Sequence, residues 1–373
     1  MIMEEAKINR LQFFLLVLMF ELGTAIVISL GTEAGRDAWL AILLGALGGT
    51  FLFSVYYQLH LFYPNQLFTT YVKQIVGKLA GGIIGYIYIL YFLYIAARDL
   101  RDFGEFLLTA FYPETPLFFI NSLMIIVIMY AARSGIEVIA RTGELNVAVL
   151  YLLALSGIIL LFFSNAIDLG ELKPFLENGF LPVLKATFSE TLYVPFGETI
   201  VFLFIFPYLN HRKGGRIIGI GALLLSGLSI FVTTVVNICT LGMIVMKNSP
   251  FPLLAAIKEI DVMEFLQRLD VYFLISLFIG AFFKIVIYFY VSVTAIADFF
   301  RLDSHKPMVY PMGIVILIIS MLIASNFPEH IREGLKWVTL YLHLPFQVVV
   351  PFLLLLIAFW KNRGKKMEEK LSG

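Results

Sequence analysis

The sequence predicts an all-α integral membrane protein with ten transmembrane helices. Of its 373 residues, 60% are apolar and 14% are charged, and the mean hydropathy is +0.91. Ordinary soluble chains have about 45 to 50% apolar and about 25% charged residues. The apolar residues also form runs of about 20, the length that a helix needs to cross a bilayer. We therefore expect lipid to surround most of the chain.

The predicted spans occupy nearly the whole chain, so we treat residues 1–373 as a single polytopic membrane domain that ends in a tail at 362–373. The longest outer connections, 165–185 and 245–269, are too short for a separate catalytic domain. The ten apolar runs are 11–32, 38–62, 80–111, 116–132, 144–164, 186–208, 216–244, 270–299, 308–325 and 335–360.

The distribution of lysine and arginine predicts the orientation. Sixteen of them fall on the side of the N-terminus and eight on the other side, while Arg98, Arg101 and Lys284 lie within spans. Loops rich in these residues stay in the cytoplasm. Because ten spans return the chain to its starting side, both termini are expected to be cytoplasmic.

Several classes of function find no support in the sequence. The single cysteine, Cys239, excludes a disulfide framework. A net charge of +1 without a basic, aromatic-rich tract argues against nucleic acid. No convincing metal-ligand cluster, nucleophile–base pair or phosphate-binding glycine loop is present. We expect no catalytic residue, metal or cofactor, and therefore no enzyme.

Two predicted spans contain helix-breaking residues near their middles. Glu21 and Gly23 interrupt span 1, and Pro195, Gly197 and Glu198 interrupt span 6. Proline removes a backbone donor and glycine permits unusual dihedral angles. Unwound backbone survives at membrane depth only inside protein or beside a wet cavity, and paired breaks in two halves point to a substrate site. The alternative is two kinked helices with interfacial acids.

The spacing of the spans repeats weakly. Spans 1 to 5, residues 8–164, and spans 6 to 10, residues 186–361, each open with an interrupted helix followed by four further spans. Five spans in each half place the two halves in opposite orientations. The sequence thus suggests an inverted repeat.

Span 3 carries five charged residues. At about 100° per residue, Arg98, Arg101, Asp102 and Glu105 share an arc of about 100°, and Asp99 falls outside it. A spacing of four residues predicts the ion pairs Arg98–Asp102 and Arg101–Glu105 along one face of the helix. We expect this face to line a vestibule. The alternative is that the helix has already left the bilayer, because residues 80–97 nearly span it.

Lys284 lies in the middle of span 8, between apolar triplets. An ionisable residue at that depth is by default a candidate functional residue. Its expected partners are Glu21, Glu198 or unwound carbonyl groups, and Tyr288 follows one turn later on the same face. The alternative role of Lys284 is a purely structural ion pair. Glu137 and Arg141, four residues apart, predict the start of a helix before span 5.

Four segments together resemble a known family. They are Glu21–Ala25, Ala97–Phe103, Thr115–Pro116 and Ala132–Arg141. The chain resembles the B subunits of spore germinant receptors, within the amino acid, polyamine and organocation transporter superfamily. The resemblance implies a LeuT-like 5+5 inverted repeat with interrupted helices 1 and 6. It also implies residence in the spore inner membrane, with a receptor A subunit and a lipoprotein C subunit as partners.

The resemblance further implies a small nutrient ligand, with an amino acid expected, bound at the two breaks. The expected function is nutrient sensing that triggers germination, and the alternative is a proton-coupled amino-acid transporter. Lys284 joins the candidate site through its position, and Glu21, Glu198, Asp102 and Glu105 are candidates for proton transfer or charge pairing. The positions that the resemblance assigns to ligand binding are Gly23, Thr24, Ala25, Arg98, Val194, Phe196, Gly197 and Tyr288.

Overall fold

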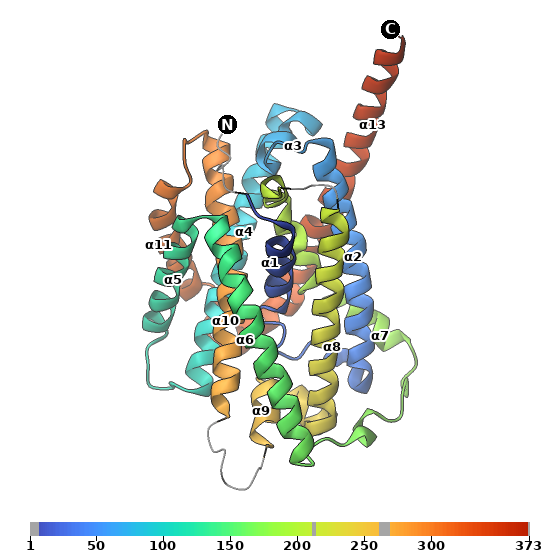
Figure 1. Cartoon of the computed structure of the whole chain (residues 1–373), viewed down its shortest axis with the longest axis vertical. Helices are drawn as coiled ribbons and strands as arrows, with labels where there is room; N and C mark the ends of the chain where they lie inside the picture. The colour runs from blue at the N-terminus through green and yellow to red at the C-terminus, as the bar shows by residue number, and fades with distance from the viewer. Residues whose placement is uncertain (1–6, 211–213, 261–268, 372–373) are drawn as a thin grey trace.

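A computed structural model describes residues 7–210, 214–260 and 269–371, with side chains as far as residue 362. The regular elements within these ranges are helices, which pack side by side along the long axis of the molecule (Figure 1). An isolated bridge joins Ile8 to Leu209. Helix α1 begins, and α13 ends, toward the same end of the molecule (Figure 1).

Seven helices in the described part of the chain have the length and apolar composition to cross a membrane. The first comprises η1 (Thr32–Asp37) and α2 (Ala38–Phe62), and the last comprises α12 (Phe327–Glu333), η6 (Gly334–Val349) and the start of α13 (Val350–Leu371). The chain is thus a multi-pass membrane protein, as predicted. The other five are α4 (Lys78–Ala110), α5 (Leu117–Ser134), α6 (Ile136–Phe163), α8 (Gly215–Asn248) and α10 (Asp270–Phe300).

The remaining predicted spans correspond to shorter or interrupted elements. Span 9 is the 17-residue helix α11 (Lys306–Leu322), and span 1 contains the 13-residue helix α1 (Arg10–Leu22). Span 6, predicted over 186–208, is a series of short elements that follows the helix α7 (Leu181–Ala186). They are the π-helix η3 (Thr187–Thr191) and the 3₁₀-helices η4 (Phe196–Phe204) and η5 (Phe206–Tyr208).

Helix α1 begins and ends where local chemistry favours it. Asn9 and Gln12 form a reciprocal capping box at its start. The helix stops at Leu22 because Gly23 adopts a φ of 30°, and turns occupy the chain up to η1. The predicted break is therefore present, and no second α-helical half follows it within the predicted limits 11–32.

Several smaller elements complete the bundle. The sequence did not predict the short helices α3 (Phe68–Val76), η2 (Leu169–Leu172) and α9 (Pro252–Lys258). The predicted helix start before span 5 is confirmed, because α6 begins at Ile136 and Arg141 pairs with Glu137 at 2.5 Å.

The two interrupted segments run in opposite directions. The Ile8 amide donates to the Tyr208 carbonyl at 3.0 Å, which joins the start of α1 to the end of η5. At their other ends, Gly23 and Glu198 both lie against Lys284. Because the start of one segment meets the end of the other, α1 and the η4–η5 segment are antiparallel.

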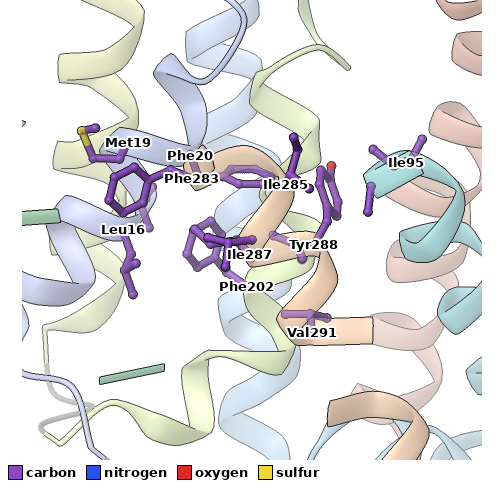
Figure 2. Close-up of a cluster of buried hydrophobic side chains, with 14 of the residues drawn as sticks. Leu16, Met19, Phe20, Ile95, Phe202, Phe283, Ile285, Ile287, Tyr288 and Val291 are labelled. Atoms are coloured by element: carbon purple, nitrogen blue, oxygen red, sulfur yellow. The ribbon is translucent and has the colours of Figure 1, made fainter. Parts of the chain in front are cut away.

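Buried aromatic rings hold these segments together in the middle of the bundle (Figure 2). The Phe20 ring of α1 packs edge-on against Phe202 of η4 at 5.5 Å and against Tyr288 of α10 at 5.1 Å between centroids. Each such pair contributes about 0.5 to 1.5 kcal/mol beyond its buried area. The breaks are therefore set in a packed apolar surround.

Candidate functional site

Lys284 and Glu198 form an ion pair in the interior of the bundle. The Lys284 Nζ contacts the Glu198 Oε2, and the two residues are 2% and 3% exposed. Two charges removed from water need close pairing to offset their desolvation. Of the partners predicted for Lys284, Glu198 is the one that makes the direct contact. The lysine Nζ also lies 4.6 Å from the centroid of the Phe20 ring.

Two further carboxylates surround the same lysine. Lys284 interacts electrostatically with Asp99 of α4 and with Glu21 of α1, in addition to Glu198. Glu21 is fully buried, and neither of its carboxylate oxygens has a hydrogen-bond donor among the described residues. The Oδ2 atom of Asp99 is likewise buried without a donor there. We call Glu21, Asp99, Glu198 and Lys284 the charge cluster.

Sequence reasoning missed Asp99. The helical arc grouped the other four charged residues of span 3 into one stripe and left Asp99 outside it. Its position outside the arc could have identified it, because an acid that lies within a span and has no partner on its own helix needs one elsewhere in the bundle. Lys284 of α10 and Arg98 of α4 both act on the Asp99 carboxylate electrostatically.

Gly23 brings the end of α1 against α10. A Cβ on Gly23 would lie 2.8 Å from the Phe20 carbonyl oxygen and 2.9 Å from Lys284 Cδ. One turn before Lys284, a Cβ on Gly280 would overlap the Gly23 carbonyl oxygen. Only glycines allow the two backbones to approach this closely, and the positive φ of Gly23 adds to the requirement. Thr24 and Ala25 follow and are also buried.

Gly197, at the break in span 6, faces a group of hydrogen-bonded side chains. Its carbonyl oxygen accepts from Tyr56 Oη at 3.4 Å, and its Cα lies against Gln347 Oε1. Gln347 Nε2 donates to Tyr91 Oη at 3.1 Å, and His343 Nδ1 lies 2.8 Å from the same hydroxyl. Of these polar residues, His343 carried only a weak sequence signal, and the other three carried none.

The other predicted residues of span 6 lie elsewhere around the break. Phe196 is fully buried and packs against Gly49 of α2 and Gly227 of α8. Val194 is half-buried immediately before Pro195. Tyr288, predicted on the Lys284 face of α10, is buried against the ring of Phe20 and belongs to the central cluster.

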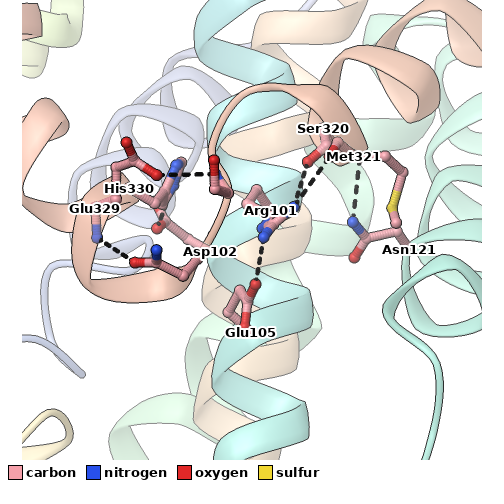
Figure 3. A network of polar contacts seen from close by, with 10 residues as sticks. Arg101, Asp102, Glu105, Asn121, Ser320, Met321, Glu329 and His330 are labelled. Atoms are coloured by element: carbon pink, nitrogen blue, oxygen red, sulfur yellow. Dashed lines mark hydrogen bonds and ion pairs between the residues drawn. The ribbon is translucent and has the colours of Figure 1, made fainter.

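One predicted ion pair of span 3 is confirmed. Arg101 Nη2 lies 2.7 Å from Glu105 Oε1 (Figure 3). The same guanidinium donates to the carbonyl oxygens of Ser320 at 3.2 Å and Met321 at 3.3 Å. Arg101 therefore binds α4 to the end of α11.

The other predicted pair, Arg98–Asp102, is wrong. Asp102 Oδ1 lies 2.9 Å from His330 Nε2, and Arg98 donates instead to the His330 carbonyl oxygen at 2.6 Å. His330, which is fully buried on α12, thus contacts Asp102 through its side chain and Arg98 through its carbonyl oxygen. Figure 3 shows His330 beside Asp102. Helical spacing alone could not reveal a helix from the far end of the chain that packs over both residues.

A cavity of about 450 Å³, which we call the charged cavity, lies close to the start of span 6. It is bounded by η1, by the start of span 6 and by α12 with η6. Charged residues of both signs line it. Glu33 and Glu190 are acidic, and Arg332 and Lys336 are basic. Among the residues that the structure describes, no group of three or more metal-ligating side chains is found.

Comparison with solved structures shows the fold. The complex of MhsT with L-phenylalanine matches with a TM-score of 0.68 and 15% identity, and the match covers 92% of this chain and 88% of MhsT. The nucleobase-cation-symport-1 family transporter MHP1, with bromovinylhydantoin bound, matches with a TM-score of 0.67 and 14% identity, covering 89% and 75%. The predicted LeuT-like transporter fold is therefore supported.

Comparison by sequence shows the family. Spore germination protein KB of Bacillus subtilis is 46% identical over 371 residues, which cover 100% of this chain and 99% of that protein. Spore germination protein XB of Bacillus anthracis is 25% identical, with 90% and 91% covered. The family model described as spore germination protein matches residues 7–328. The chain therefore belongs to the spore germination protein family of multi-pass membrane proteins.

Proposed function

We propose that this protein is the nutrient-sensing membrane subunit of a spore germination receptor and that its ligand is an amino acid. The observation that carries the proposal is the charge cluster, in which three buried carboxylates share one lysine between two helix breaks. Glu21 retains two carboxylate oxygens without a donor among the described residues. Such a site suits a small ligand that brings its own ammonium group.

The two ends of an amino acid would find complementary partners here. The ammonium group would bind Glu21 and Asp99, and the carboxylate would bind Lys284 in exchange for Glu198 and accept from the backbone amides of Thr24 and Ala25. The Gly23 amide is already used, because it donates to the Met19 carbonyl at 3.0 Å. Arg98, Val194, Phe196, Gly197 and Tyr288 would form the surrounding walls and hinges. Because a ligand shifts an equilibrium only by its difference in affinity for the two states, release of Glu198 would supply that difference.

The charged cavity, which would open to the outer side of the membrane, would provide the route of approach. Its acidic and basic residues, Glu33 and Glu190 with Arg332 and Lys336, complement a zwitterion. Thr339, which also lines this cavity, lies one helical turn before His343. The ligand would pass from there toward Gly197 and the charge cluster.

The architecture proposed is ten crossings in a 5+5 inverted repeat, residues 8–164 and 186–361. The antiparallel arrangement of α1 and the η4–η5 segment supports it, because corresponding elements of inverted halves run in opposite directions. Both termini would be cytoplasmic in the spore inner membrane. The start of α1 and the end of α13 lie toward the same end of the molecule, which supports placing both termini on one side. A receptor A subunit and a lipoprotein C subunit would respond to the conformational change that the ligand causes.

A proton-coupled amino-acid transporter is the second candidate function. It is favoured by the transporter fold and by the buried carboxylates, of which Glu21 or Glu198 could carry the proton, with Asp102 and Glu105 as further charge-pair candidates. Uptake of labelled amino acids into proteoliposomes that contain this chain alone distinguishes the two. A receptor gives no accumulation above empty liposomes, and a transporter gives accumulation driven by a pH gradient.

The proposal is tested by germination of spores that depend on this chain. Gly23→Leu should abolish or weaken the response to amino acids, because the new side chain overlaps Lys284 and the Phe20 carbonyl. Gly82→Leu is the matched control, since nothing lies within 4 Å of a Cβ there. Immunoblots must show normal membrane levels of each variant.

If Gly23→Leu does not accumulate, the isosteric Glu21→Gln replaces it in the same assay. An unchanged dose dependence in an accumulating variant of either residue contradicts the proposed site.

A further inference from the structure

A second, chemically different cavity of about 340 Å³ lies between α6 and α8. Residues of α9 and of the first turns of α10 also line it. Its lining is mostly aliphatic and includes Leu22 and Ile26, which flank the break in span 1. This cavity is separate from the charge cluster and plays no part in the proposed function.

The cavity has the length of one leaflet of a bilayer. It follows α6 from Leu150 to Leu161 and α8 from Leu225 to Asn237. At 1.5 Å per residue these stretches are about 17 Å long, close to half of the hydrocarbon core of about 30 Å. Beside the cavity, α6 exposes Leu155 to the surroundings of the bundle. An extended hydrocarbon chain matches both its length and its lining.

The hydroxyl groups of Tyr151, Ser229 and Tyr272 in the lining have hydrogen-bond partners within the protein. Tyr151 Oη lies 2.8 Å from Ser229 Oγ, and Ser156 Oγ donates to Tyr272 Oη at 3.3 Å. Asn237 differs, because it is 3% exposed and its Oδ1 atom has no donor among the described residues. A buried acceptor without a donor is costly, so the occupant should supply one hydrogen-bond donor.

Asn237 lies near the end of the cavity that a lipid headgroup would reach. Two residues later, the Cys239 carbonyl oxygen accepts from the amide of Asp168, in the loop that follows the end of α6. The cavity therefore runs from the level where α6 leaves the membrane to the break after Leu22. A polar group at one end and an apolar interior are the chemistry of a phospholipid.

We propose that this cavity holds one acyl chain of a membrane phospholipid, whose headgroup or glycerol region donates a hydrogen bond to Asn237 Oδ1. The acyl chain packs against Leu22 and Ile26 and so supports the unwound backbone at Gly23 from the lipid side. The break in span 1 then contacts the charge cluster on one face and a lipid on the other.

Photo-crosslinking tests this site. The full chain is placed in nanodiscs with phosphatidylglycerol that carries a diazirine on one acyl chain, and labelled peptides are identified by mass spectrometry. Labels should concentrate in 150–161 and 225–237. Gly157→Phe should lower that labelling several-fold, because Gly157 lines the cavity and a Cβ there meets only Tyr272 Cδ1, at 3.9 Å.

Gly82→Phe on α4 is the matched control, with open space around its Cβ, and it should keep the wild-type labelling. Val232→Phe fills the cavity from α8 and serves if Gly157→Phe does not fold. Asn237→Leu should reduce labelling as well. Either of two results overturns the proposal. One is an even distribution of labels over the lipid-facing helices, and the other is undiminished labelling in a folded cavity-filling variant.

Discussion

Lys284 of α10 and Glu198 of η4 form a buried ion pair whose side chains are 2% and 4% exposed. The pair joins span 8 to the break in span 6, and the aliphatic part of the lysine rests against Gly23 at the break in span 1. One side chain thus contacts both interrupted segments. A change in that contact is a direct way to couple a bound ligand to the positions of both breaks.

Loss of Lys284 should destabilise the protein. Lys284→Met leaves Glu198 without its cation beside two other buried carboxylates, and loss of one partner of a buried pair costs about 3 to 5 kcal/mol. The double variant Lys284→Met/Glu198→Gln should recover much of that loss, because no unpaired charge remains at the former pair. The stability of both variants is measured by thermal unfolding in detergent, with size-exclusion chromatography as the readout of folded protein. A double variant no more stable than the single would contradict the pairing.

Asp99 and Asp102 should behave differently although they share one helix. Asp99→Asn neutralises a carboxylate of the charge cluster, so the amino-acid dose response should shift while stability is kept. Asp102→Asn weakens the contact with the buried His330, and stability should fall by about 1 to 3 kcal/mol with the half-maximal dose unchanged. Paired dose-response and melting curves test this, and identical effects would show that Asp99 has no separate role.

Gly280→Ala tests the close approach of α10 to the Gly23 carbonyl. The added methyl group overlaps that oxygen and should push the end of α1 away, at a cost of about 1 to 3 kcal/mol for overpacking. Gly82→Ala gains the same helix propensity, about 1 kcal/mol, without the overlap, and should be neutral or stabilising. Equal melting temperatures for the two variants would mean that the approach is not tight.

The helix breaks could be predicted because they depend on local chemistry. Gly23 and the Pro195–Gly197 segment oppose an α-helix through their own backbones, whatever packs around them. The Arg101–Glu105 pair could be predicted for the same reason, since spacing within one helix fixes it. The importance of Lys284 could also be predicted from the sequence, because a charged residue buried in a span needs a partner.

Contacts between distant segments could not be predicted. Asp99 acts electrostatically on Lys284, and His330 contacts both Arg98 and Asp102, because of how α4 is rotated against α10 and α12. That rotation depends on packing across the whole bundle. The same limit applies to Gln347. Nothing in its apolar run indicates the 16-residue π-helix η6 that turns it toward Gly197.

The most direct test of the central claim measures binding to the purified protein. The melting temperature of the full chain in detergent is recorded with each of the common L-amino acids, for wild type, Glu21→Gln and the double variant Lys284→Met/Glu198→Gln. A ligand at a hundred times its Kd adds about 2.7 kcal/mol of stability. At least one amino acid should raise the wild-type melting temperature and leave both variants unchanged. No shift in the wild type, or an equal shift in all three proteins, would contradict an amino-acid site at the charge cluster.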